Sequence, residues 1–253
     1  MTRVLVTGAA SGLGAALTSA FRARGDEVLA TDRDAPDGGL ALDVTHDADW
    51  ALALERVERD WGGLDVLVNN AGIAGGGRVD VCTLDEWQRL VDVNLLGVVR
   101  GSRAFAPMLK RQGSGRIVNI ASLAGLVHPP GMGSYNAVKA AVVAFSETLS
   151  HELAPYGVGC TAVCPSYFRT SLMTHGAGSD ADVSAKVAQL VEQSPITADD
   201  IAAAVLAGLD EGADLVVPDE PARQAVALKR HDRAAYDAEM RRTAARLKER
   251  SDA

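Results

Sequence analysis

Tyr135 and Lys139 are the pair of side chains in this sequence best suited to proton transfer. They lie in the segment Ser-Tyr-Asn-Ala-Val-Lys-Ala-Ala-Val-Val, whose helical pattern places both side chains on one face. A free tyrosine has a pKa of about 10, but a nearby ammonium group favours the phenolate and should lower that pKa. Of the four tyrosines, only Tyr135 has a lysine four residues later. On its own, the pair equally fits a helix face where a tyrosine packs on a lysine stem.

Ser122 and Asn94 are two further polar residues that bear on this chemistry. Ser122 follows the apolar run of residues 117–121, where its hydroxyl can donate a hydrogen bond to a substrate oxygen. Tyr135 can protonate an alkoxide that develops on a substrate oxygen and can take the proton back in the reverse reaction. Asn94, in the segment Val-Asn-Leu-Leu-Gly, is by itself typical of a mid-helix amide that bonds to the backbone.

The run Thr-Gly-Ala-Ala-Ser-Gly-Leu-Gly at residues 7–14 predicts a pyrophosphate site. It follows the apolar run of residues 4–6 and opens a helical pattern that continues through Phe21. Glycines there allow a tight turn and a close approach of the backbone to a ligand, and the helix amino terminus offers N–H groups and a positive dipole end. The alternative is a flexible turn between strand and helix without a ligand.

Asp32 bears on the choice of nucleotide. It lies eighteen residues beyond Gly14, at the end of the second apolar run, where a carboxylate can accept hydrogen bonds from the adenosine ribose and repel a 2′-phosphate. Arg33, beside it, could pair with that phosphate. We predict NAD rather than NADP, and the alternative is a helix-capping or surface aspartate.

Short apolar runs that alternate with helical patterns must position these residues. Such alternation predicts strands of a parallel sheet, which are nearly continuously apolar because helices cover both faces. We therefore expect an α/β fold, a doubly wound parallel sheet of the Rossmann type, in a single domain with a helical C-terminal extension. The expected strands are Val4–Thr7, Glu27–Thr31, Val66–Asn69, Arg116–Ala121, Val158–Cys164 and Leu215–Val217.

Taken together, these motifs resemble those of the short-chain dehydrogenases/reductases. The resemblance covers roughly residues 3–218 and rests on the glycine pattern, Asn69-Asn70-Ala71-Gly72, Asn94, Ser122 and Tyr135-x-x-x-Lys139. The glycine spacing is similar to that of the single-domain alcohol dehydrogenase and ketoreductase branch and differs from that of the longer epimerases. The resemblance implies dimers or tetramers and the catalytic set Asn94, Ser122, Tyr135 and Lys139.

The resemblance also implies roles for individual residues. Lys139 would hold the nicotinamide ribose, and Asn94 would position a water that relays protons from Lys139. Residues 43–44 would contact the adenine, and Thr170 the nicotinamide carboxamide. The implied cofactor-binding set is Gly8, Ser11, Gly12, Leu13, Gly14, Asp32, Arg33, Asp43, Val44, Asn70, Ala71, Gly72, Tyr135, Lys139, Pro165, Phe168 and Thr170.

Two segments depart from the family pattern. Pro165-Ser166 stands where the family commonly has Pro-Gly, and the last expected strand lacks the glycine often found there.

The loop between Ser122 and Tyr135 carries His128. We expect this side chain to pack or to meet solvent rather than to act in catalysis. The expected pocket lining is apolar and favours a hydrophobic secondary alcohol or ketone; it comprises Leu123, Met132, Tyr167, Phe168, Leu172 and Met173.

The chain divides, on this interpretation, into a catalytic domain of residues 1–220, with a substrate loop at about 166–197, and a basic helical extension of residues 221–253. The extension holds nine basic and five acidic residues, a charge of +4, so residues 1–220 carry −12. We expect a mobile loop around residues 176–184. An amphipathic helix is expected there, and we expect it to pack on the rest of the protein; its apolar residues are Tyr236, Met240, Ala244 and Leu247. The alternatives are that it folds over its own active site or reaches an acidic neighbour in an oligomer, whereas an alanine-rich face without tryptophan argues against a membrane surface.

Bulk composition excludes several classes of protein. A net charge of −8 argues against a nucleic-acid partner. The sequence contains no run of eighteen uncharged apolar residues, so we expect no membrane-spanning helix. We expect a cytoplasmic protein without a metal site, in which Cys82, Cys160 and Cys164 are reduced core residues. The alternatives to an oxidoreductase are a catalytically silent NAD(H)-sensing protein and a lyase or epimerase that uses its cofactor transiently.

Overall fold

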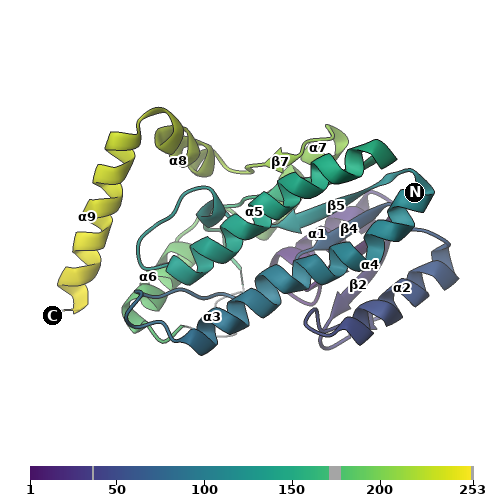
Figure 1. The fold of residues 1–253 in the computed structure, drawn as a ribbon, viewed down its shortest axis with the longest axis horizontal. Helices are drawn as coiled ribbons and strands as arrows, with labels where there is room; N and C mark the ends of the chain where they lie inside the picture. Colours follow the sequence, from purple (N-terminus) through teal and green to yellow (C-terminus); the bar gives the residue numbers. More distant parts are fainter. Residues whose placement is uncertain (36, 171–177, 252–253) are drawn as a thin grey trace.

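A seven-stranded parallel sheet forms the centre of the computed structural model, which describes residues 1–35, 37–170 and 178–251 (Figure 1). The strand order is β3-β2-β1-β4-β5-β6-β7. The expected doubly wound α/β fold is confirmed. The strands are β1 (Arg3–Thr7), β2 (Glu27–Asp32), β3 (Leu40–Ala41), β4 (Val66–Asn69), β5 (Gly115–Ile120), β6 (Val158–Val163) and β7 (Leu215–Val216).

Helices cover both faces of the sheet. Successive strand residues point to opposite faces, so Val4 and Val6 pack with α1 and α7, whereas Leu5 between them packs with α2, α4 and α5. The helices are α1 (Gly12–Ala23), α2 (Asp47–Trp61), α3 (Leu84–Leu90), η1 (Val91–Leu96), α4 (Gly97–Gln112), η2 (Leu123–Gly125), α5 (Gly133–Leu153), η3 (Ala154–Tyr156), α6 (Ala181–Glu192), α7 (Ala198–Asp210), α8 (Glu220–His231) and α9 (Arg233–Ser251).

Four local expectations need correction. The sequence pattern missed β3, because two residues are too short to show a period. The helix expected around Asn94 contains the π-helical turn η1. Of the loop expected at residues 176–184, residues 181–184 form the first turn of α6, capped by Asp180, and residues 176 and 177 lie outside the described residues. The amphipathic helix expected through residues 236–247 is present as α9, but a second helix, α8, precedes it and Ala244 is exposed instead of lying on a buried face.

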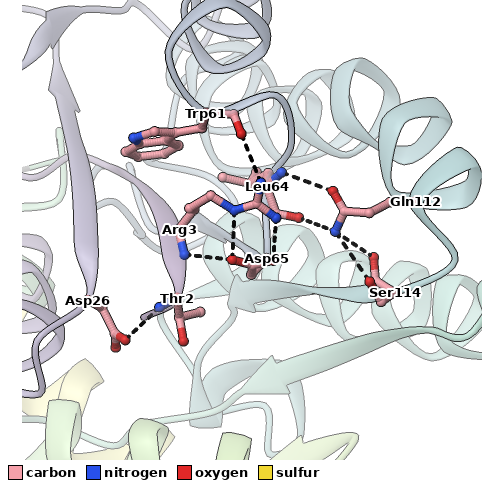
Figure 2. A network of polar contacts seen from close by, with 8 residues as sticks. All are labelled: Thr2, Arg3, Asp26, Trp61, Leu64, Asp65, Gln112 and Ser114. Atoms are coloured by element: carbon pink, nitrogen blue, oxygen red, sulfur yellow. Dashed lines mark hydrogen bonds and ion pairs between the residues drawn. The ribbon is translucent and has the colours of Figure 1, made fainter.

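The amino ends of β1 and β4 are joined by an ion pair (Figure 2). The Arg3 guanidinium donates to both carboxylate oxygens of Asp65, from Nε at 2.9 Å and from Nη2 at 2.7 Å. Its Nη1 donates to the carbonyl of Trp61 at 3.0 Å, and Gln112 closes the same corner through both backbone groups of Leu64. The hydrogen bond from Arg3 holds the pKa of the Asp65 carboxyl below its usual range, although burial acts the other way.

The strand order reverses beside β1, which pairs with β2 on one side and β4 on the other. In open α/β sheets this reversal leaves a crevice at the carboxyl ends of the strands, where ligands bind. Across the described part of the chain, none of the helices has the length and apolar character needed to cross a membrane. The helices α8 and α9 follow β7 and lie at one end of the molecule, where α9 contacts α6 (Figure 1).

Candidate active site

One cavity of about 480 Å³ lies at the carboxyl ends of β1, β2, β4, β5 and β6. Its volume is in the range of small-molecule sites. It is lined by every residue that the sequence assigns to catalysis or cofactor binding except Asn94. These lining residues are Gly8, Ser11, Gly12, Leu13, Gly14, Asp32, Arg33, Asp43, Val44, Asn70, Ala71, Gly72, Ser122, Tyr135, Lys139, Pro165, Phe168 and Thr170.

The turn between β1 and α1 has the geometry that a pyrophosphate requires. Gly8 has φ +67° and Gly12 φ +52°, conformations that residues with a Cβ rarely adopt. A Cβ at Gly14 would collide with the carbonyl of Gly8 and the side-chain amide of Asn70. Ser11 precedes α1 without a side-chain cap, so the first N–H groups of the helix are open to an anion.

Thr7 ties this turn to the end of β4. Its hydroxyl accepts hydrogen bonds from the backbone N–H of Asn70 and of Ala71, both at 3.0 Å. The Asn70 amide donates in return to the Thr7 carbonyl at 2.8 Å. No local pattern marks Thr7 for this role, because its partners lie more than sixty residues away and only the pairing of β1 with β4 brings them together.

Two aspartates line the end of the cavity next to β2. Asp32 accepts hydrogen bonds from the N–H of Ala10 at 3.0 Å and of Arg33 at 2.8 Å, so its carboxylate is held by backbone groups. Asp43 accepts from the N–H of Thr45 at 2.8 Å and from its hydroxyl at 2.6 Å. Burial alone would raise the pKa of Asp43, but the bonds from Thr45 outweigh it and lower that pKa. The Arg33 side chain is exposed at the same end.

The predicted acid–base pair lies on α5 at the other end of the cavity. Lys139 Nζ is 5.7 Å from the centroid of the Tyr135 ring and donates to the carbonyl of Ile120, at the end of β5, at 2.8 Å. Ser122 begins η2, where its Oγ accepts from the N–H of Ala124 at 3.1 Å. The strand end and the helix therefore bring Ser122, Tyr135 and Lys139 to one wall.

Burial controls the proton affinity of this pair. It raises the pKa of Tyr135 to about 12, against the opposing effect of a hydrogen bond with Ser122. It lowers the pKa of Lys139 to about 8, because the ammonium is withdrawn from water, although Cys164 acts in the opposite direction. The expectation that Lys139 lowers the pKa of Tyr135 is wrong for this structure, because burial of the phenol outweighs the influence of its neighbours.

The substrate end of the cavity is apolar. The expected lining residues Leu123, Met132, Tyr167 and Phe168 are present there, whereas Leu172 and Met173 lie outside the described residues. The Tyr167 hydroxyl contacts the Met132 sulfur at 3.5 Å. The helix α6 adds Val183, Val187 and Val191 to this wall, a stripe at helical spacing that the sequence analysis missed but could have found by its period.

An ion pair holds α6 in this position. Arg78, on the segment after β4, donates to Asp180 from its backbone N–H at 2.9 Å and from Nε at 2.7 Å. The side chain of Asp180 is fully buried and also caps α6 by accepting from the N–H of Val183.

Glu86 lies next to this ion pair. Hydrogen bonds from Ser179 and Thr83 lower the pKa of Glu86 to about 2, against the effect of burial.

Comparison with known proteins identifies the family. A family model described as short chain dehydrogenase matches residues 2–180. The chain belongs to the short-chain dehydrogenase family. It is 36% identical over 244 residues to a 2-(R)-hydroxypropyl-CoM dehydrogenase of Xanthobacter autotrophicus, covering 86% of this chain and 97% of that protein.

Solved structures of short-chain dehydrogenases share this fold with either nucleotide bound. An enzyme of Burkholderia phymatum in complex with NAD matches with a TM-score of 0.85 and 28% identity, covering 91% of this chain and 93% of that one. An enzyme of Burkholderia cenocepacia in complex with NADP matches with a TM-score of 0.81 and 29% identity, covering 94% and 97%. This chain is accordingly an NAD(P)-dependent dehydrogenase that acts on CH–OH groups.

Asn94 of this short-chain dehydrogenase lies behind the cavity wall and not in it. It is fully buried, and its side-chain amide bonds twice to Ile73, accepting from the N–H at 2.8 Å and donating to the carbonyl at 2.9 Å. It therefore holds the segment that follows Gly72. The side chain is committed to this backbone segment, which agrees with the amide-to-backbone interpretation, while the implied water relay stays a prediction.

His128 and the cysteines lie outside the cavity lining of the dehydrogenase. His128 contacts Lys229 of α8. That it has no catalytic role stays a prediction. All three thiols are free, and Cys160 and Cys164 are buried as expected. Cys82 is a correction, because it is only partly buried, with its sulfur 3.7 Å from the hydroxyl of Ser134.

Proposed function

We propose that the chain interconverts a hydrophobic secondary alcohol and the corresponding ketone with NAD(H), and that Tyr135 is its general acid and base. The observation that carries this proposal is the convergence of Tyr135, Lys139 and Ser122 on one wall of a cavity. The same cavity is lined by the glycine turn, at Gly8 and residues 11–14. A hydride donor held along the cavity and a proton donor at its end are what carbonyl reduction requires.

The side chains divide the work as follows. The nicotinamide, when bound, supplies or accepts the hydride. Tyr135 keeps its proton across the neutral range because burial raises its pKa to about 12, so it can protonate an alkoxide in reduction. Lys139 is positively charged below pH 8 and stabilises the phenolate that this transfer leaves. Ser122 donates a hydrogen bond to the substrate oxygen, where negative charge develops.

NAD rather than NADP is the proposed cofactor. The support is Asp32, whose carboxylate is oriented by two backbone N–H groups and lines the cavity where an adenosine ribose would lie. A carboxylate accepts bonds from ribose hydroxyls and repels a 2′-phosphate. Arg33 beside it lines the same end, so the preference is decided by comparing the Kd values of NADH and NADPH on the native protein.

The substrate class follows from the apolar wall. Met132, Tyr167 and Val187 offer apolar contact area for the substrate, and the relative from Xanthobacter is named for a 2-hydroxypropyl compound. We further propose the division at residue 220 into a catalytic domain and an extension, a homodimer or homotetramer, and a cytoplasmic location.

A screen of ketones and secondary alcohols by NADH absorbance tests the proposal. We expect loss of absorbance with apolar ketones and gain with their alcohols. Turnover without a net absorbance change would instead indicate a lyase or epimerase, and tight NADH binding without turnover of any compound would indicate a sensor.

A further inference from the structure

The C-terminal helix pair, α8 and α9, begins at a hydrogen-bonded contact with the cavity wall. Ser166, which replaces the family's usual glycine, donates to Asp219 from its N–H at 3.0 Å and from its hydroxyl at 2.7 Å. Asp219 in turn caps α8 by accepting from the N–H of Ala222 at 2.8 Å. The serine of the first departure from the family pattern therefore binds the segment between β7 and α8.

The helix pair also holds the loop between Ser122 and Tyr135. The Lys229 ammonium donates to the carbonyl of Leu126 at 2.6 Å and lies 3.0 Å from His128 Nδ1. The hydroxyl of Tyr236, a buried residue, accepts from the His128 N–H at 3.0 Å. Burial and the charge of Lys229 lower the pKa of His128, which favours the neutral ring that can accept from the ammonium.

A third contact joins α9 to α6. A Cβ built on Gly131 would lie 3.1 Å from Leu247 of α9 and 2.9 Å from Val183 of α6, so these two side chains meet at this glycine. Val183 lines the cavity, as do Val127, Pro129 and Met132 of the intervening loop. The helix pair therefore contacts three segments that line the cavity: Ser166, the loop of residues 126–132, and α6.

We propose that the C-terminal helix pair fixes the shape of the substrate end of the cavity, with Tyr236 and Lys229 as positioning residues. None of residues 220–249 lines the cavity itself. The helix pair therefore acts through the cavity-lining segments that it contacts. Within the described residues, hydrogen bonds of the helix pair and its capping residue Asp219 reach residues 126, 128, 166, 217 and 218, and none reaches the glycine turn or Asp32. The effect should therefore fall on the substrate and spare the nucleotide.

Two single variants of the full chain test this inference, Tyr236→Phe and Lys229→Met. We expect faster hydrogen–deuterium exchange in residues 126–132 and unchanged exchange in residues 8–14. We also expect the KM for a ketone to rise about fivefold in Tyr236→Phe, because one neutral hydrogen bond is lost, and about tenfold in Lys229→Met, where the bond is charge-assisted. The Kd of NADH should stay at the wild-type value.

A second tyrosine and lysine provide matched controls. Tyr156 is 47% exposed and contacts Lys110 Nζ at 4.5 Å from its ring centroid, remote from the cavity lining. Tyr156→Phe and Lys110→Met should change neither exchange in residues 126–132 nor KM. Wild-type exchange in both test variants, or an NADH Kd that rises together with KM, would overturn the inference.

The kinetic part of the test rests on the proposed function, whereas the exchange measurement does not. If the wild-type protein reduces no ketone, the proposed function fails. The positioning role is then judged by exchange in residues 126–132 alone, where unchanged rates in both Tyr236→Phe and Lys229→Met refute it.

Discussion

At the amino end of the sheet Arg3 and Asp65 bind each other, whereas at the carboxyl end the hydrogen bonds of the Asp32 and Lys139 side chains, within the described residues, go to backbone groups. The Arg3 guanidinium meets both oxygens of Asp65, so that pair neutralises itself. Asp32 is held by two N–H groups and Lys139 by the carbonyl of Ile120, so each keeps its net charge at the cavity wall.

The kind of partner therefore distinguishes a structural charge from a chemical one. Two opposite charges that satisfy each other stabilise the fold and offer little to a ligand. A charge oriented by backbone dipoles remains available to bind a ribose or to stabilise a phenolate. Variants at the two ends should accordingly change different observables.

Tyr135→Phe should have the largest effect. Removing the phenol oxygen deletes the proposed proton donor, and we expect kcat to fall about a thousandfold. The aromatic ring stays in place, so the melting temperature and the Kd of NADH should match the wild type. Stopped-flow or steady-state NADH absorbance measures kcat, and fluorescence titration measures the Kd of NADH. Unchanged turnover would refute the mechanism.

Asp65→Asn should produce the opposite result at the amino end. We expect the free energy of unfolding at pH 7 to fall by about 2 kcal/mol, the size of a charge-assisted hydrogen bond, with kcat/KM of the folded protein unchanged. The folded state lowers the pKa of Asp65, so its contribution is present above about pH 4 and is lost as the pH falls through the folded pKa. Denaturant titrations at pH 7 and pH 3 measure this difference.

A matched surface pair is the control for that variant. Asp47, whose side chain is 83% exposed, pairs with Arg100 at 3.0 Å. Asp47→Asn should change stability by only a few tenths of a kcal/mol, about the value of an exposed ion pair. An equal loss in Asp47→Asn and Asp65→Asn would remove the distinction between the two pairs.

The pH dependence of ketone reduction should report Lys139. Its pKa is about 8, so the ammonium is present below pH 8 and lost above it, while Tyr135 stays protonated in this window. We expect kcat/KM to be level below pH 8 and to fall about tenfold for each further pH unit. Asp65→Asn should show the same inflection, and a level profile up to pH 10 would contradict the role of Lys139.

Asp32→Ala should have the smallest effect, confined to the nucleotide. We expect the Kd of NADH to rise about fivefold, as for one partly exposed hydrogen bond, and the Kd of NADPH to change less because the repulsion of its phosphate is relieved. Fluorescence titration of both nucleotides measures the ratio. A native protein that binds NADPH more tightly than NADH would overturn the proposed preference.

Local periodicity was enough to predict six of the seven strands and the cavity residues at the carboxyl ends of those strands. The run of residues 4–7 is apolar because both its faces are buried, and strand ends in parallel sheets meet at one edge, so Asp32, Asn70 and Ser122 could be assigned to one crevice. The strand β3 and the π-helical turn around Asn94 leave no such period and were missed.

The sequence by itself determined the cavity residues at the strand ends and on α5, because strand and helix periods are local and the glycine, Asp32 and Tyr135–Lys139 motifs lie at element ends. Only the tertiary structure decided the pKa of Tyr135, which burial raises, and the long-range contacts of Thr7, Arg78 and Ser166. Burial and pairing depend on elements far apart in the chain, so no spacing within one segment encodes them.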